Sequence, residues 1–173
     1  MNFILRDFRA EDFETLWRID QECFAPGIAY SRRELSAYLR RRGAFAIVAE
    51  VVRPGETPGT SRDAQTAGIA GFIVAEASRR GVGHIISIDV LPESRRCGLG
   101  SQLLTAAEDR LRAVPCYTVV LETAVDNISA LSFYKRHQYA VVQVAPRYYP
   151  NGMDAFLLVK DLVQKSRSTG RAI

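Results

Sequence analysis

The most informative stretch of this 173-residue chain is Ser87-Ile88-Asp89-Val90-Leu91-Pro92-Glu93-Ser94-Arg95-Arg96-Cys97-Gly98-Leu99-Gly100-Ser101. A buried strand is expected to end near Leu91, a loop supplies two arginines, and two glycines open an amphipathic helix. Amides at a helix start lack intrahelical partners and lie at the positive end of the helix dipole, and glycine lets an anion reach them. The pattern predicts a phosphate-binding cradle. The alternative is that Gly98 and Gly100 only serve tight packing at the helix start.

Two common nucleotide-binding patterns are missing from the chain. It has no G-x-x-x-x-G-K-[ST], which argues against a P-loop kinase or ATPase. It also has no G-x-G-x-x-G followed by an acid about 20 residues later, which argues against a dinucleotide-binding fold. The remaining pattern, R-x-x-G-x-G after a strand, therefore points to another kind of phosphate ligand.

Hydrophobic periodicity predicts further elements on both sides of this stretch. We expect strands over 3–8, 44–52, 67–77, 82–91, 117–123, 139–144 and 155–159. We expect a helix carrying Leu16, Ile19 and Cys23, and further helices over 31–42, 99–111 and 128–137, the second beginning at the capping box Ser31-Arg32-Arg33-Glu34. The order predicts an α+β fold with a mixed, mostly antiparallel central sheet of about seven strands and four helices on its faces. The crossover through the third helix should be right-handed.

A single domain suffices for a chain of this length. We expect it to span residues 1–162, followed by a flexible basic tail over 163–173, with a long flexible connection over 53–66. No segment approaches the roughly 20 unbroken apolar residues of a membrane-spanning helix. The charged start of the chain and three cysteines without CxxC spacing predict a cytoplasmic protein that has neither a disulfide framework nor a cysteine-rich zinc site.

The net charge of +4 raises the question of nucleic-acid binding. Only three of the 23 basic residues are lysines, and the arginines are scattered in doublets instead of lining one stripe. The densest group, at positions 32, 33 and 40–42, brackets a short helix without the interleaved aromatic residues of a stacking platform. We therefore expect no direct nucleic-acid partner and no membrane partner, and we interpret this group as a solvated helix face.

The pattern R-x-x-G-x-G after a strand resembles the acyl-CoA motif of the GNAT superfamily of acetyl-CoA-dependent N-acetyltransferases, and the expected element order is similar to that family's from Arg6 to about Leu162. The resemblance implies acetyl-CoA as cosubstrate and no metal. It implies that Arg95 occupies the first basic position of the motif and that backbone groups of Ile88 and Val90 bond the pantetheine arm. The CoA pyrophosphate would be held by the amides of Arg96, Cys97, Gly98, Leu99, Gly100 and Ser101. In the family, the strand with Ile88 and the strand near Glu122 splay apart around the thioester.

A second motif, Leu121-Glu122-Thr123-Ala124-Val125-Asp126-Asn127-Ile128-Ser129-Ala130-Leu131-Ser132-Phe133-Tyr134, resembles the RimI-like branch, whose members acetylate protein N-termini, including that of a bacterial ribosomal protein. The resemblance implies that Asn127 contacts pantetheine, that Glu122 is the base, directly or through water, and that Tyr134 protonates the leaving thiolate. An α-amine with a pKa of about 7.7–8.0 is acidic enough for such a base. Without the resemblance, Asn127 also fits a helix cap, Glu122 a surface ion pair and Tyr134 a core aromatic residue.

The acceptor side is predicted from Arg147-Tyr148-Tyr149-Pro150, which resembles the R-x-Y-Y-P loop of the same branch. The resemblance implies that Arg147, Tyr148 and Tyr149 close over the acceptor peptide; otherwise the tyrosines are exposed loop residues. Phe24 and Tyr30 lie in the connection between the first two helices, and the resemblance implies that this connection forms the other wall of the acceptor site. The chain departs from the branch at residues 25–29, which lengthen that connection, at residues 53–66, and at Gln138, where the family has a glycine.

We therefore expect an enzyme that transfers an acetyl group from acetyl-CoA to the N-terminal α-amine of a protein by direct attack in a ternary complex, as a monomer or homodimer. The alternatives are a small-molecule or lysine acetyltransferase on the same fold and a CoA-binding sensor without turnover. The only histidines, His84 and His137, have no serine, cysteine or acid partner in recognisable sequence context. This argues against a hydrolase triad and a metal site.

Overall fold

The computed structural model describes residues 2–52 and 68–162. The strands are β1 (Asn2–Asp7), β2 (Ala44–Val52), β3 (Ile69–Ala77), β4 (Val82–Val90), β5 (Thr118–Ala124), β6 (Ala140–Ala145) and β7 (Ala155–Asp161). The helices are α1 (Phe13–Cys23), α2 (Arg32–Leu39), α3 (Leu99–Ala113) and α4 (Ile128–Arg136), and short 3-10 turns cover Ala10–Asp12 and Pro92–Ser94. The expected connection over 53–66 and the expected tail over 163–173 lie outside the described residues.

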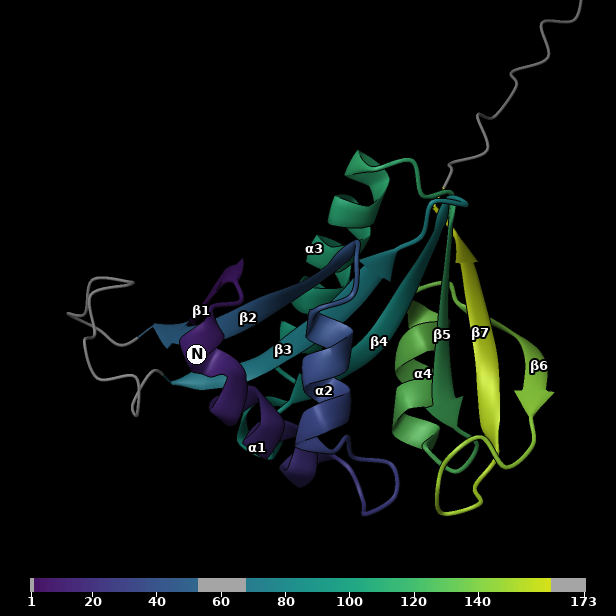
Figure 1. Ribbon diagram of the computed structural model, residues 1–173, viewed down its shortest axis with the longest axis horizontal. Helices are drawn as coiled ribbons and strands as arrows, with labels where there is room; N and C mark the ends of the chain where they lie inside the picture. The colour runs from purple at the N-terminus through teal and green to yellow at the C-terminus, as the bar shows by residue number, and fades with distance from the viewer. Residues whose placement is uncertain (1, 53–67, 163–173) are drawn as a thin grey trace, which may run out of the picture.

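One seven-stranded sheet with the order β1-β2-β3-β4-β5-β7-β6 forms the centre of the fold (Figure 1). Every neighbouring pair is antiparallel except β4 and β5, which are parallel and are joined through α3. The predicted fold class, a mostly antiparallel sheet of about seven strands with four helices, is therefore confirmed.

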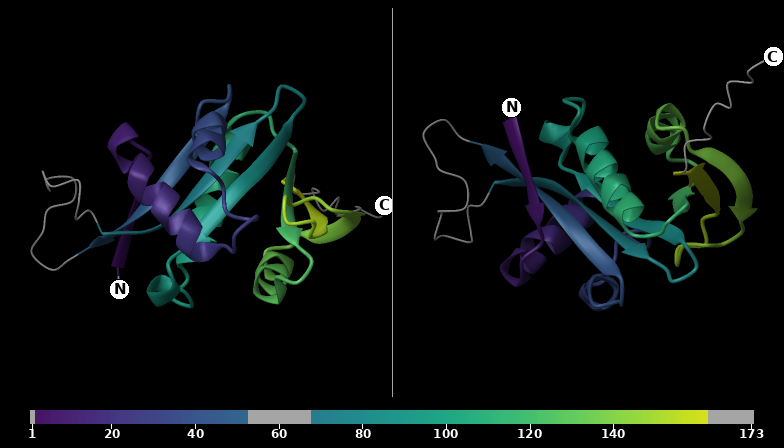
Figure 2. Two further views of the ribbon diagram at one scale, coloured as in Figure 1. Left: turned by 60° about the horizontal axis from the view of Figure 1, so that its bottom comes forward. Right: turned by 90° about the horizontal axis from the view of Figure 1, so that it is seen from above.

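Helices cover both faces of the sheet: α1 and α2 lie on one face, and α3 and α4 lie on the other (Figure 2). Because side chains alternate along a strand, β3 sends Phe72 and Val74 to the α1–α2 face and Ile73 to the α3 face. Leu16 of α1 and Leu104 of α3 are fully buried against these two sets. The central strands are apolar throughout because both of their faces are covered.

The sheet opens between β4 and β5. These strands pair only from Val82 opposite Thr118 to His84 opposite Val120, and they diverge beyond this point (Figure 1). On its other side, β4 stays paired with β3, although the register shifts where Ile86 has no partner. A bulge of this kind bends a strand and increases its twist, which turns the end of β4 away from β5. The divergence leaves a wedge-shaped gap in the middle of the sheet.

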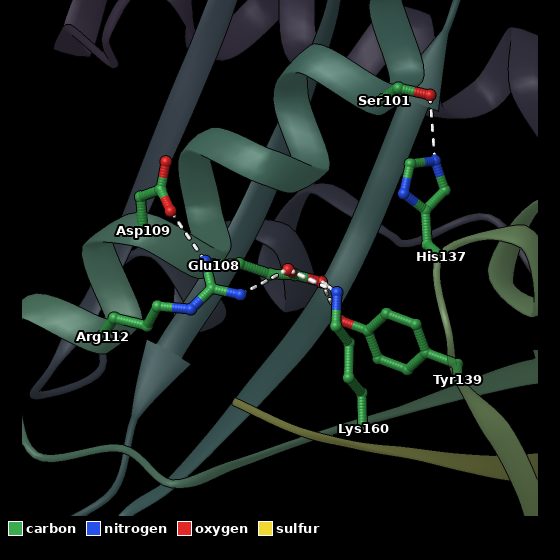
Figure 3. Close-up of polar contacts among 7 residues, drawn as sticks. All are labelled: Ser101, Glu108, Asp109, Arg112, His137, Tyr139 and Lys160. Carbon is green, nitrogen blue, oxygen red and sulfur yellow. Dashed lines mark hydrogen bonds and ion pairs between the residues drawn. The ribbon is translucent and has the colours of Figure 1, made fainter. Parts of the chain in front are cut away.

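Side chains on α3 connect the two halves of the sheet where the strands do not (Figure 3). The buried carboxylate of Glu108 accepts hydrogen bonds from Lys160 Nζ of β7 at 2.6 and 2.8 Å and from the Tyr139 hydroxyl at 3.0 Å. Two turns earlier on α3, Ser101 Oγ lies 2.9 Å from His137 Nε2 at the end of α4. These contacts set the spacing between α3 and the β5–β7 half, and thus the width of the gap.

The capping pattern predicted from the sequence for α2 is confirmed, but its predicted end is wrong. Ser31 and Glu34 form the predicted capping box, with Ser31 N donating to Glu34 Oε2 at 2.9 Å. Gln138, which stands where the family has a glycine, has a left-handed backbone with φ of 69°. The prediction that α2 continues to about residue 42 is wrong, because the helix ends at Leu39. Gly43 has a φ of +85° and packs so closely that a Cβ there would lie 2.5 Å from the carbonyl oxygen of Ala77. The chain must therefore leave the helix early to enter β2.

Candidate active site

The predicted cradle lies at the N-terminus of α3. Gly98 is the N-cap residue with φ of +85°, a conformation that favours glycine, and a Cβ there would meet nothing within 4 Å. In the described part of the chain, no backbone carbonyl accepts a hydrogen bond from the amides of Gly98, Leu99, Gly100 or Ser101. Tight packing therefore does not explain Gly98, and the free amides at the positive end of a 15-residue helix suit an anion.

The arginine and cysteine side chains of the cradle loop are engaged with its backbone. Arg95 Nε donates to the carbonyl oxygen of Val90 at 2.8 Å, and Cys97 Sγ donates to the carbonyl oxygen of Ser94 at 2.8 Å. Arg96 is exposed and adopts φ of 63°, which turns the chain toward Gly98. Arg95 thus joins the cradle loop to the end of β4, so that the expected phosphate and pantetheine sites are adjacent.

The backbone of Ile88 and Val90 faces the gap between β4 and β5. The amide of Leu91 donates to the carbonyl oxygen of Ala70 at 2.9 Å, so Leu91 and Asp89 direct their backbone groups toward β3. The intervening residues, Ile88 and Val90, therefore direct theirs to the opposite side, where β5 has already diverged. The Val90 carbonyl oxygen already accepts from Arg95 and from Cys23 Sγ, so an extended ligand could be added there as a strand through the Ile88 backbone and the Val90 amide.

A carboxylate–imidazole pair lies on the α1–α2 side of the gap. Glu122 Oε2 of β5 is 2.7 Å from His84 Nε2 of β4, and both side chains are mostly buried. Burial by itself lowers the pKa of His84, but the carboxylates of Glu122 and Glu76 outweigh burial, and the pKa is raised. The sequence motif indicated Glu122 but not His84, whose position opposite Val120 brings it beside Glu122.

Two pairs of tyrosines lie on this part of the molecule, and Tyr148 and Tyr149 are near Glu122. The rings of Tyr148 and Tyr149 pack edge to face at 5.1 Å, and those of Tyr30 and Tyr38 do so at 5.0 Å. Burial raises the pKa of Tyr148 above its usual range and that of Tyr149 to about 12, and the nearby carboxylate of Glu122 adds to both shifts. The Tyr30 hydroxyl donates to the carbonyl oxygen of Ile86 at the β4 bulge, at 3.2 Å. Tyr38 is the member of this group that the sequence did not reveal.

The two loops that carry the aromatic residues touch. Gly27, in the α1–α2 loop, has φ of +83°, and a Cβ there would lie 2.8 Å from Asn151 Cβ in the β6–β7 loop. Within these loops, Phe24 is partly buried just after α1, while Arg147 is exposed and its amide donates to Asp154 Oδ1 at 2.7 Å. The contact joins the two expected walls of the acceptor site at one end.

Tyr134 and Asn127 lie on and before α4. Asn127 Oδ1 accepts from the amide of Ala130 at 3.1 Å and so caps the helix, as one interpretation of the sequence required. Tyr134 is 6% exposed and belongs to the core on the α3 face, where it packs edge to face with Phe133 and Tyr139. Burial raises the pKa of Tyr134, with smaller effects of Asp89 and Tyr149, so the phenol keeps its proton at neutral pH.

The chain matches the profile of a known protein family. A profile described as "Acetyltransferase (GNAT) family" matches residues 13–139, which is well over half of the chain. The chain belongs to the GNAT acetyltransferase family. The resemblance indicated by the cradle motif is thus confirmed. The matched region of this GNAT domain extends from α1 through the cradle to the end of α4.

Curated relatives share part of the GNAT domain. An uncharacterized N-acetyltransferase of Methanocaldococcus jannaschii is 38% identical over 93 residues, which cover 53% of this chain and 59% of that protein. An N-alpha-acetyltransferase of Sulfurisphaera tokodaii is 38% identical over 81 residues, 46% of this chain and 48% of that protein. The chain therefore spans about half the length of the curated relatives it matches.

Solved structures match the GNAT domain over nearly its whole length. Ard1 from Thermoplasma volcanium has a TM-score of 0.79 at 23% identity, with 95% of this chain and 100% of that chain covered. The ribosomal-protein-S18-alanine N-acetyltransferase from Escherichia coli has a TM-score of 0.76 at 18% identity, with 96% and 98% covered. The NatC complex bound to Gag peptide and CoA has a TM-score of 0.75 at 25% identity, with 94% and 100% covered. The GNAT fold is therefore confirmed.

The GNAT domain also contains two buried carboxyl groups beneath the α1–α2 loop. Asp20 is completely buried, and its Oδ2 accepts from the amide of Tyr30 at 2.7 Å, while its Oδ1 has no partner. Burial raises the pKa of Asp20 to about 6. Asp89 is 1% exposed, accepts from Ser87 Oγ at 2.6 Å, and has a pKa raised well above its usual value by burial and by Asp20. Asp20 thereby holds the backbone of Tyr30, which is expected to line the acceptor site.

Two further structural findings bear on the expectations from sequence. No helix among residues 2–52 and 68–162 is long and apolar enough to cross a membrane. The cysteines Cys23, Cys97 and Cys116 are all free.

Proposed function

We propose that this GNAT domain transfers the acetyl group of acetyl-CoA to the N-terminal α-amine of a protein or peptide. The observation that carries the proposal is the hydrogen-bonded pair of Glu122 and His84 on one side of the β4–β5 gap, with the free amides of the α3 cradle at the end of the same gap. A base, a phosphate site and a strand edge for pantetheine are thereby available along the part of β4 that β5 does not pair.

The cosubstrate would be held by backbone groups. The pyrophosphate would bind the amides of residues 96–101, and the pantetheine arm would lie along Ile88 and Val90, with Asn127 as a further contact. The Val90 amide would polarise the thioester carbonyl, as an oxyanion-hole donor does. The sequence motif and the conformation of Gly98 support these assignments.

The acceptor chemistry favours an α-amine over a lysine side chain. With a pKa of about 7.7–8.0, roughly a third of an α-amine is neutral near pH 7.5, whereas for a lysine with a pKa of about 10.4 the fraction is roughly a thousandth. A carboxylate supported by an imidazole is a sufficient base for the α-amine. The tyrosines at 30, 38, 148 and 149 offer flat surfaces and hydroxyl groups for the backbone of the first acceptor residues.

The transfer itself would need two proton movements. The Glu122–His84 pair accepts a proton from the amine, whose nitrogen attacks the thioester carbon and forms the new C–N bond. The C–S bond then breaks, and the CoA thiolate takes the phenolic proton of Tyr134, which solvent later restores. Tyr134 carries its proton at neutral pH, and because burial raises its pKa, it would release that proton only to a thiolate held in direct hydrogen-bond contact.

The relatives support the same substrate class. Several carry the name N-alpha-acetyltransferase, including those of Sulfurisphaera tokodaii and Sulfolobus acidocaldarius, and the NatC structure holds a peptide together with CoA. A RimI-like preference and a cytoplasmic location are part of the proposal; the three free cysteines support a reducing compartment.

The test is an acetylation assay with purified protein, acetyl-CoA and matched peptides that have a free or a blocked N-terminus and one internal lysine. We expect CoA release only with the free N-terminus. We expect Glu122→Gln and Tyr134→Phe to lower kcat by about 100-fold or more while CoA affinity measured by calorimetry stays unchanged. Tyr117→Phe, at an exposed tyrosine outside the proposed site, is the control. Acetylation of the blocked peptide at lysine would contradict the substrate class, and full activity of both variants would contradict the assigned roles.

A further inference from the structure

The imidazole of His84 lies between two carboxylates. Its Nε2 is 2.7 Å from Glu122 Oε2, and its Nδ1 is 3.7 Å from Oε1 of Glu76 on β3. Glu76 and His84 are direct partners in the antiparallel register of β3 and β4, so their side chains stand on the same face of the sheet. The proposed acetyl transfer uses Glu122 and His84 and gives no role to Glu76.

Glu76 is in turn held by a residue just beyond α2. Arg41 Nη1 lies 3.3 Å from Glu76 Oε1, and the Arg41 guanidinium stacks over the Tyr38 ring at 4.2 Å. Charges of alternating sign thus run from the end of α2 through Arg41, Glu76 and His84 to Glu122. The side chains of Glu76 and His84 are 22% and 27% exposed, so solvent screens this interaction less than it would at a fully exposed site.

We propose that Glu76, restrained by Arg41, is a positioning residue that orients the His84 imidazole toward Glu122 and sets the pH range in which the Glu122–His84 pair accepts a proton. This inference rests on the proposed function, because it assigns a task to a neighbour of the proposed base. A carboxylate at each ring nitrogen fixes the ring orientation and favours the imidazolium. Arg41 offsets part of the Glu76 charge and therefore acts in the opposite direction.

The groups that face His84 come from each element around it. Glu76 approaches from β3 and Glu122 from β5, and both raise the pKa of His84 against the effect of burial. Arg41 approaches from the end of α2 through Glu76. Tyr148 of the β6–β7 loop lies near Glu122, and burial raises its pKa, so it stays uncharged at neutral pH. Removing Glu76 should therefore make His84 easier to deprotonate, and removing Arg41 should make it harder.

The first test is an NMR titration of the protein without substrates. The chain has two histidines, so His84 can be followed with His137 as an internal reference. We expect Glu76→Gln to lower the His84 midpoint by about 1 pH unit and Arg41→Gln to raise it by a smaller amount. Arg42→Gln, which removes a neighbouring exposed charge, is the matched control and should leave the midpoint in place. If Glu76→Gln does not fold, Arg41→Gln provides the same test with the opposite sign.

The second test is the pH profile of kcat/KM for one peptide with a free N-terminus. We expect the acid limb to move to lower pH in Glu76→Gln and to higher pH in Arg41→Gln, with an unchanged KM for acetyl-CoA. If the wild-type protein acetylates no α-amine, the proposed function is wrong. If the wild type is active but neither variant moves the His84 midpoint or the acid limb, the role of Glu76 alone is overturned.

Discussion

The contribution of the buried Asp20 carboxyl to the stability of this protein should fall as pH rises. Its side chain is completely buried, and burial raises its pKa to about 6, although hydrogen bonds from Tyr30 and Gln21 partly oppose the shift. In the unfolded chain the pKa of an aspartate is about 3.9. Because the folded value is the higher one, folding favours the protonated form. The stabilisation is complete below about pH 4 and is lost as pH rises through about 6.

The size of the effect follows from the shift of about two pH units, which corresponds to about 3 kcal/mol. In Asp20→Asn, the side chain still offers an oxygen to the Tyr30 amide but cannot ionise. The amide also places an NH2 where Oδ1 has no partner, which lowers the stability of the variant equally at every pH. The difference in the free energy of unfolding between variant and wild type should therefore change by about 3 kcal/mol from pH 4 to pH 8, in favour of the variant.

Urea denaturation of both proteins between pH 4 and pH 8 measures this difference, provided that the m-values agree. Glu22→Gln removes an exposed carboxylate from the same helix and controls for the loss of one negative charge. A difference between Asp20→Asn and wild type that stays constant within about 1 kcal/mol across this range would refute the reasoning. In that case Asp20 would be ionised throughout, and the hydrogen bonds to Tyr30 and Gln21 would outweigh its burial.

Three further substitutions test the cradle, the α4 cap and the contacts around α3. Gly98→Ala should lower the free energy of unfolding by about 1–2 kcal/mol, because the backbone there is left-handed; an unchanged urea midpoint would contradict this. Asn127→Ala should lose about 1 kcal/mol with the cap of α4, seen as a Tm lower by about 2–4 °C, and an equal Tm would show that the cap is dispensable. Lys160→Met should cost about 3–5 kcal/mol, because Glu108 stays buried without its closest cation; a loss below 1 kcal/mol in urea would mean that Arg112 and Tyr139 suffice.

Features that depend on a few consecutive residues could be predicted from the sequence. The capping box at Ser31 and Glu34 and the N-cap at Asn127 follow from local hydrogen bonding, which tertiary packing did not change. The end of α2 could not be predicted in this way. It depends on the approach of Gly43 to the backbone of Ala77, which lies in another strand.

The sequence by itself determined the order of elements and the helix that begins at Leu99 after the glycine-containing loop, because periodicity and short motifs are read along the chain. Only the tertiary structure decided that Glu76, His84 and Glu122 meet. These residues lie on three different strands, and their contact depends on the pairing of β3, β4 and β5 and on the point where β4 and β5 separate. Likewise, the burial of Asp20 depends on how α1 packs on the sheet. Register and packing join residues far apart in sequence, and no local pattern records such distances.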